Sequence, residues 1–161
     1  MIQLKLKNKK GQFNINSKEV KNILEIRQDI DLVQDISNTI NQEDIMVFDC
    51  KLAESIFSKA LAQQLIEESD GEIDESFFEL FFEDVRAFLK DTTDEIEAEL
   101  QEIYSVDNIR CCSDIYRIND EFTDFKFVFV VSFKETAIAV LDNLAQIISK
   151  RQLAGASKFY C

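Results

Sequence analysis

The chain has 161 residues, of which 46% are hydrophobic and 30% charged, so we expect residues 1–161 to form one globular domain around a single core. It contains no histidine and only three glycines, which excludes histidine-dependent catalysis and glycine-rich phosphate-binding loops. The net charge of −13 opposes direct binding to nucleic acid. No apolar run approaches the roughly 20 residues that span a membrane, so we expect a cytoplasmic protein. We also expect it to be bacterial or phage-encoded.

The N-terminal residues alternate apolar and polar side chains, which is the pattern of strands with one buried face. Leu4 and Leu6 alternate in this way before a polar turn, and Phe13 and Ile15 do so after it. The spacing predicts a β-hairpin in which Leu6 lies opposite Phe13 and Leu4 opposite Ile15, with all four side chains on one face.

Helical and strand patterns then alternate along the chain. Ser17 is placed to cap a helix, and the apolar spacing in 30–44 suggests a continuation of helix. The apolar run near 45–50 predicts a short buried strand. Residues 52–69 predict another helix, which Gly71 would end with a left-handed cap.

The segment that follows holds all the excess negative charge of the chain. Residues 67–102 contain fifteen acids and two bases, an imbalance equal to the net charge of the whole protein. Two capping boxes, Ser76 with Glu79 and Thr92 with Glu95, predict two separate helices here. We expect this acidic helical segment, residues 67–104, to be inserted between the strands.

The C-terminal third returns to strands and ends in a helix. Residues 109–134 predict a hairpin, and its second strand should be central because one face is almost entirely phenylalanine. A helix is predicted over 135–153, with Gly155 as its stop. The complete pattern predicts an α+β fold, with a mixed or antiparallel sheet of four to five strands packed with about five helices.

The cysteines do not indicate a metal centre, and we expect no cofactor. Cys50, Cys111, Cys112 and Cys161 have no zinc-type spacing, and the chain offers no histidine to complete a site. Cys111 or Cys112 could act as a nucleophile only with a neighbouring group, such as Arg110, that lowers the thiol pKa. Buried, reduced strand thiols are the simpler interpretation.

A phenylalanine-rich helix near residues 77–89 allows two interpretations. Its apolar face could dock a partner helix, since aromatic side chains concentrate binding energy. We favour packing against the phenylalanine face of the strand at 125–133, because an exposed patch of that size would promote aggregation.

The acidic helices offer the main candidate site. Carboxylates four residues apart on a helix stand about 5–6 Å apart, close to the spacing of phosphates along a nucleic-acid strand. Such a surface could be merely solubilising, could steer a basic partner, or could mimic nucleic acid. The candidate residues are Glu79, Glu83, Asp91, Asp94, Glu95, Glu99 and Glu102.

The loop around Gly71 resembles the middle of a calcium-binding EF-hand, with Asp70, Glu72 and Asp74 as weak metal candidates. Placing Gly71 at the sixth loop position puts Ile66 at the first position and Phe77 at the twelfth. Neither can ligate calcium, so we do not expect a metal site.

The leading hypothesis is a non-enzymatic module that binds a basic protein, such as a nucleic-acid-handling enzyme, as an inhibitor, an immunity-type protein or an anti-defence nucleic-acid mimic. One alternative is a phage-like structural or assembly subunit, for which a homo-oligomer would be expected. The other is a metal-dependent enzyme or cation-binding protein, because carboxylate pairs can act without histidine.

Overall fold

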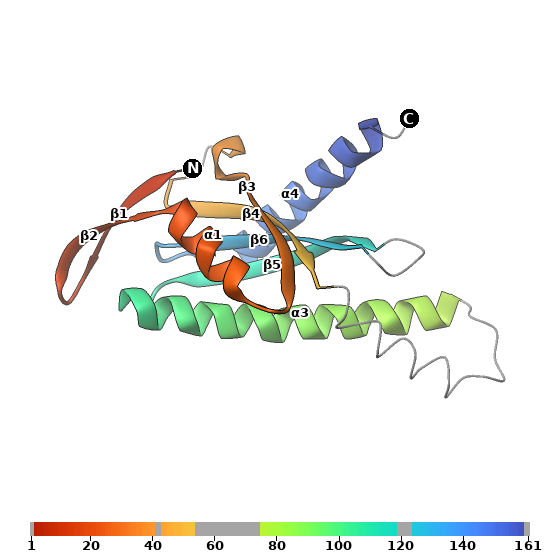
Figure 1. The fold of residues 1–161 in the computed structure, drawn as a ribbon, viewed down its shortest axis with the longest axis horizontal. Helices are drawn as coiled ribbons and strands as arrows, with labels where there is room; N and C mark the ends of the chain where they lie inside the picture. The colour runs from red at the N-terminus through yellow and green to blue at the C-terminus, as the bar shows by residue number, and fades with distance from the viewer. Residues whose placement is uncertain (1, 41–42, 54–74, 119–123, 160–161) are drawn as a thin grey trace.

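A computed structural model describes residues 2–40, 43–53, 75–118 and 124–159 of the chain, with backbone only at 75–78 and 156–159 (Figure 1). Within these ranges six strands form two sheets, accompanied by three α-helices and one short 3-10 helix. The predicted α+β class is confirmed. The expectation of one sheet of four to five strands with about five helices is wrong, because the N-terminal hairpin forms a sheet of its own.

That hairpin consists of β1 (Gln3–Asn8) and β2 (Gly11–Asn16), paired antiparallel. Leu6 pairs with Phe13 and Leu4 with Ile15, so the predicted register is confirmed. The tight turn places Gly11 at φ +123°, a conformation that residues with a side chain rarely adopt.

The helix α1 (Ser17–Ile26) follows directly, but Ser17 is not its cap. The Asn16 side chain takes that role by accepting a 3.0 Å hydrogen bond from the Glu19 N–H. The Ser17 hydroxyl instead accepts from the Ile2 N–H at 2.8 Å and donates to Asp35. It therefore ties the hairpin to the following strand.

Within 30–44, where the spacing suggested a continuation of helix, Ile30–Asp35 form the strand β3 and Ser37–Thr39 form the 3-10 helix η1. The pairing of β3 shifts register between Ile30 and Leu32. This irregularity brings Ile30 and Val33, three residues apart, into the same core cluster. A helix-like apolar spacing therefore arises here in a strand.

The main sheet has the order β3-β4-β6-β5 and is antiparallel throughout. Its other members are β4 (Ile45–Leu52), β5 (Arg110–Ile118) and β6 (Phe125–Ser132). β6 lies between β4 and β5, so its predicted central position is confirmed. β3 and β5 are the two edge strands.

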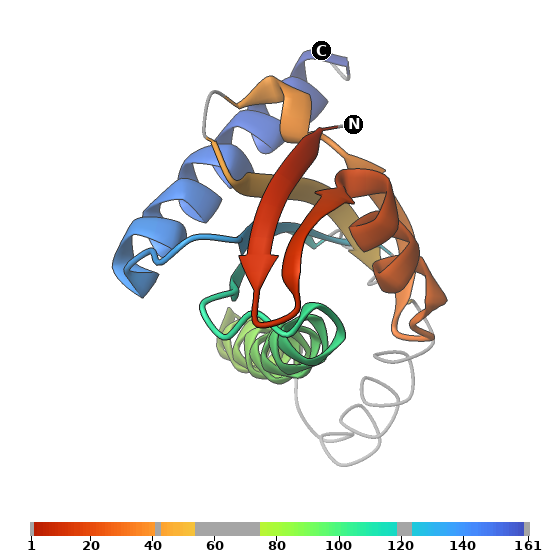
Figure 2. The ribbon, with the colours of Figure 1, turned by 90° about the vertical axis from the view of Figure 1, so that its left-hand side faces the viewer.

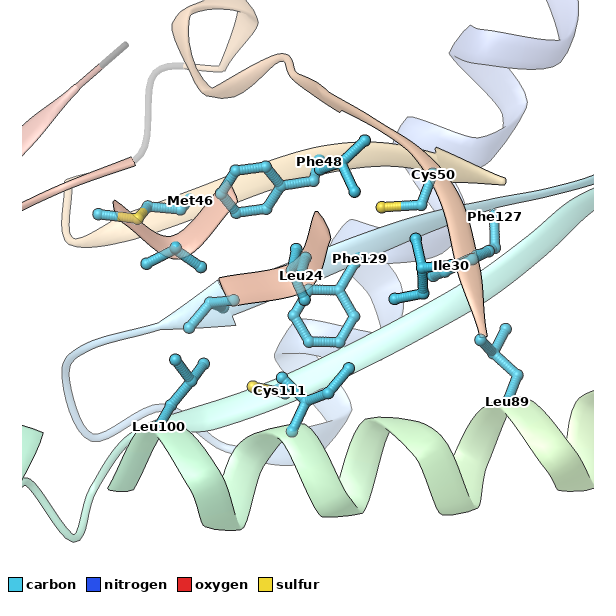
Figure 3. Packing of buried hydrophobic residues seen from close by; sticks show 14 of the residues in the cluster. Leu24, Ile30, Met46, Phe48, Cys50, Leu89, Leu100, Cys111, Phe127 and Phe129 are labelled. Atoms are coloured by element: carbon cyan, nitrogen blue, oxygen red, sulfur yellow. The ribbon is translucent and has the colours of Figure 1, made fainter. Parts of the chain in front are cut away.

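The sheet is covered on both faces (Figures 1 and 2). The hairpin, α1 and α3 (Glu75–Tyr104) contribute side chains to one core cluster, and α4 (Ile138–Phe159) contributes to the other. Alternate residues of β6 serve the two clusters: Phe127 and Phe129 face α3, while Val128 and Val130 face α4. Figure 3 shows Leu89 and Leu100 of α3 directed at this first face.

The acidic segment forms one uninterrupted 30-residue helix over its described part, not two capped helices. Thr92 lies buried in the middle, and the neighbouring Thr93 hydroxyl donates to the Leu89 carbonyl at 2.7 Å. Leu89 and Ile96 are buried on the same side of the helix, before and after Thr92. Packing on the sheet therefore keeps the helix continuous through the predicted break at Thr92.

Two further expectations about helices have different outcomes. α4 runs through Gly155 to Phe159, so Gly155 is not a stop. In the predicted helix at 52–69, Leu52 belongs to β4, and 54–69 together with Gly71 lie outside the described residues.

Candidate interaction surface on α3 and the cleft beside it

All seven predicted acidic residues are exposed, and all belong to the single helix α3. The side of the helix toward the sheet carries the buried residues Phe81, Val85, Leu89, Ile96 and Leu100. We use the name acidic face for the set of seven, which comprises Glu79, Glu83, Asp91, Asp94, Glu95, Glu99 and Glu102.

The continuity of α3 gives the acidic face a defined length. At a rise of 1.5 Å per residue, about 35 Å separates Glu79 from Glu102 along the helix axis. Two helices joined by a turn would have placed these residues along two different axes. One helix instead carries all seven along a single axis, spread over its exposed sides, with Asp94 beside β5 and Glu95 beside Arg27.

A base from outside the acidic segment reaches this surface. Arg27, just after α1, forms a two-pronged ion pair with Asp29 at 2.8 and 2.9 Å and bonds Glu95 at 2.9 Å. Its other terminal nitrogen lies 4.0 Å from Glu99. Hydrogen bonds to Asp29 and Glu95 raise the pKa of Arg27 against the opposing effect of burial. The acidic face is therefore partly neutralised near Glu95 and Glu99. The sequence did not indicate this, because Arg27 lies far from α3 along the chain.

Another α3 carboxylate has a structural role. The half-buried Glu97 accepts the backbone N–H of Cys111 on β5 at 2.9 Å. Gln101, one turn further along, donates to the Ile109 carbonyl at 2.8 Å. These two side chains attach α3 to the outer edge of β5.

The phenylalanine-rich part of α3 packs as expected where its side chains are described. Phe81 is buried and its ring lies 6.1 Å from that of Phe125 on β6. Phe82 and Phe88 are partly buried against the same cluster. The favoured core interpretation is confirmed for these residues.

A cavity of about 420 Å³ lies between α3, β5 and the start of α4. We call it the edge cleft, because five consecutive residues of the edge strand β5 line it. The two bases of α3 also line it. The complete lining is Arg86, Leu89, Lys90, Thr93, Asp94, Cys111, Cys112, Ser113, Asp114, Ile115, Ile138 and Asp142.

The thiols at this cleft are poor nucleophiles. Burial raises the pKa of Cys111, and carboxylates including Glu97 raise it further. Burial, together with a hydrogen bond to Asp142 at 2.6 Å, raises the pKa of Cys112 to about 12. Both therefore stay protonated at neutral pH, and Arg110 does not produce the activated thiol considered above.

The metal candidates Asp70, Glu72 and Asp74 fall outside the described residues. Over the part of the chain that is described, no three Cys, Asp or Glu side chains come together in a way that could hold a metal ion.

The sequence predicted the exposed carboxylates of the acidic face but not the edge cleft. The available signal was that Arg86 and Lys90, four residues apart, are the two bases in an otherwise acidic segment. Their position beside β5 depends on packing that no local pattern reveals.

Among the described helices, none is both long and apolar enough to cross a membrane. Comparisons of the chain with protein-family models, with curated proteins and with solved structures gave no match.

Proposed function

We propose that this protein is a non-enzymatic interaction module that binds a basic protein partner through the acidic face of α3. The observation that carries the proposal is the exposure of seven carboxylates along about 35 Å of one continuous helix. A helix packed on a sheet along its apolar side holds these charges in a fixed arrangement, and a fixed arrangement favours selective recognition.

The charge distribution supports steering of a basic surface. α3 contains ten acids and two bases, whereas residues 103–161 carry equal numbers of each. A field concentrated on one side of a protein accelerates association with an oppositely charged partner, most strongly at low salt. Arg27 removes part of this field near Glu95 and leaves Glu79 and Glu83 at the other end of the helix outside its reach.

Nucleic-acid-handling enzymes are the partner class that suits this surface best. Such proteins present basic surfaces to phosphates, and a row of carboxylates can occupy the same surface. The protein would then act as an inhibitor, an immunity-type protein or an anti-defence nucleic-acid mimic.

A second candidate function is assembly through α4. Val140 and Ile147, two turns apart on the same side of this helix, expose 56% and 64% of their surface. A structural or assembly subunit would use such a surface for contacts that depend little on salt.

The test measures binding of a polyarginine peptide by calorimetry over a range of salt concentrations. The variant Glu79→Gln, Glu83→Gln, Asp94→Asn should weaken binding about tenfold at low salt, because three carboxylates of the acidic face lose their charge. Double-stranded DNA and this protein should also compete for a basic DNA-binding protein used as a second probe.

The matched control removes three exposed charges outside α3, with Asp31→Asn, Asp107→Asn and Glu135→Gln. It has the same net charge as the test variant and should bind within about twofold of the parent protein. Equal losses in both triple variants would show a general charge effect and contradict the proposal. Salt-insensitive self-association without polyarginine binding would favour the assembly function instead.

A further inference from the structure

The outer edge of β5 is only partly covered. β5 ends the main sheet, so one side of its backbone has no neighbouring strand within the described residues. Glu97 and Gln101 of α3 occupy this side at the Cys111 N–H and the Ile109 carbonyl. Beyond Cys111 the same edge runs into the edge cleft.

The alternation of an antiparallel pair identifies which backbone groups point into the cleft. The Cys111 N–H points away from β6, because it donates to Glu97. Outward and inward residues alternate along such a strand, so Ser113 and Ile115 also direct their N–H and carbonyl groups outward. The pairing stays regular up to Ile115 and shifts after it. About 13 Å of edge, from Cys111 to Ile115, is therefore regular.

Helices on opposite faces of the sheet give the edge cleft two walls. The α3 wall carries Arg86 and Lys90, and Asp94 of the same helix also lines it. The α4 wall carries Ile138 and Asp142, and the Cys112 thiol binds Asp142 on that face. The α3 wall thus carries two bases and one acid, whereas the α4 wall carries the carboxylate of Asp142.

We propose that the edge cleft binds an extended peptide segment of another protein, which adds to the sheet as a strand beside β5. Its backbone pairs with Ser113 and Ile115. Side chains of an added strand point alternately to the two faces, so they meet the two walls in turn. Charge complementarity then selects acidic residues facing Arg86 and Lys90, alternating with basic residues facing Asp142.

The size of the site agrees with this occupant. About 420 Å³ lies within the range of specific binding pockets, and the regular edge is long enough to pair with four or five residues. Glu97 and Gln101 close the edge at one end, which limits how far a strand can extend. The proposal does not depend on the function proposed for the acidic face.

The test is an NMR titration of the isotope-labelled protein with an eight-residue peptide in which glutamate and lysine alternate. The amide signals of Ser113 and Ile115 should shift most, because these N–H groups would pair with the added strand. A peptide of the same sequence with N-methyl groups on its four central residues should bind at least tenfold more weakly, because it cannot pair along an edge. Equal binding of the two peptides overturns the proposal.

Charge reversal at the α3 wall provides the second measurement. Lys90→Glu, an exposed substitution, should weaken binding of the alternating peptide about fivefold or more, whereas Lys18→Glu on α1 should not. The same Lys90→Glu variant should bind polyarginine no more weakly than the parent, which separates this test from that of the acidic face. Unchanged binding of the alternating peptide by Lys90→Glu, or self-association of the protein through β5, overturns the proposal.

Discussion

The two faces of the main sheet are stabilised by different means. On the α3 face, large apolar side chains such as Phe48, Phe127 and Phe129 are fully or almost fully buried among residues of α1, α3 and the hairpin (Figure 3). On the α4 face, a smaller apolar cluster around Leu141 and Ile148 lies beside hydrogen bonds to carboxylates.

Asp49 is the centre of the polar contacts on the α4 face. It is 8% exposed and accepts hydrogen bonds from the Tyr116 hydroxyl at 2.7 Å and the Gln152 amide at 2.8 Å. Ser149 adds a hydrogen bond to the Asp114 carbonyl at 3.4 Å. Buried polar contacts therefore help to position α4. On the α3 face, burial of large apolar side chains dominates, and Glu97 and Gln101 add hydrogen bonds at the β5 edge.

The largest effect should come from removing a ring on the α3 face. Phe129→Ala leaves a cavity in the centre of the sheet and should lower the free energy of unfolding by roughly 3–5 kcal/mol. Leu141→Ala on the α4 face should cost nearer 2 kcal/mol, because that cluster is smaller and its surroundings can relax. Urea unfolding of the two variants measures the difference, and equal losses would contradict the contrast between the faces.

Removing one hydroxyl on the α4 face should have an intermediate effect. Tyr116→Phe deletes a donor to the buried Asp49 and should cost about 1–2 kcal/mol, measured by urea unfolding at neutral pH. A loss below the error of the measurement would show that Gln152 alone satisfies Asp49.

The same variant has a predicted pH signature. Burial and the bond to Asp49 raise the pKa of Tyr116 well above its usual value near 10. The unfolded chain then loses this proton at lower pH than the folded protein, so stability should fall as pH rises above about 10. Tyr116→Phe should make this alkaline decline shallower, and an unchanged slope would contradict the assignment.

The smallest stability effect should come from Arg27, which links the end of α1 to α3. Arg27→Gln breaks the partly exposed ion pairs with Asp29 and Glu95 and should cost about 1 kcal/mol or less. Because it also releases negative charge on the acidic face, polyarginine affinity should rise about twofold to fivefold at low salt.

A matched control for this substitution is Lys21→Gln, which breaks an exposed pair with Glu25 on α1 at 3.5 Å. It makes the same change in net charge away from α3. We expect a smaller gain in polyarginine affinity for this control. If the two variants gain equally, Arg27 has no specific influence on the acidic face.

Local patterns were sufficient wherever one residue spacing decided the structure. The alternation in β1 and β2 specified these strands and the hairpin register, because strand side chains point to opposite faces in turn. The aromatic and β-branched residues of β6 specified a central strand. The exposure of Glu83, Asp91 and Glu99 likewise follows from helical periodicity, once the apolar side of α3 packs on the sheet.

Local patterns failed where packing in the sheet overrode a local preference. Thr92 and Glu95 have the sequence of a helix start, but burial of Leu89 and Ile96 against the sheet favours a continuous helix. Ile30 and Val33 have helical spacing, but a register shift brings both to one face of a strand.

The sequence by itself determined the α+β class, the hairpin register and the concentration of negative charge in one helical segment, because each depends on neighbouring residues. Only the tertiary structure decided that Arg27 pairs with Glu95, 68 residues further along, and that part of the β5 edge opens into a cleft. Both features arise where α3 packs beside distant segments. Such long-range contacts depend on the burial of whole faces, which no local pattern specifies.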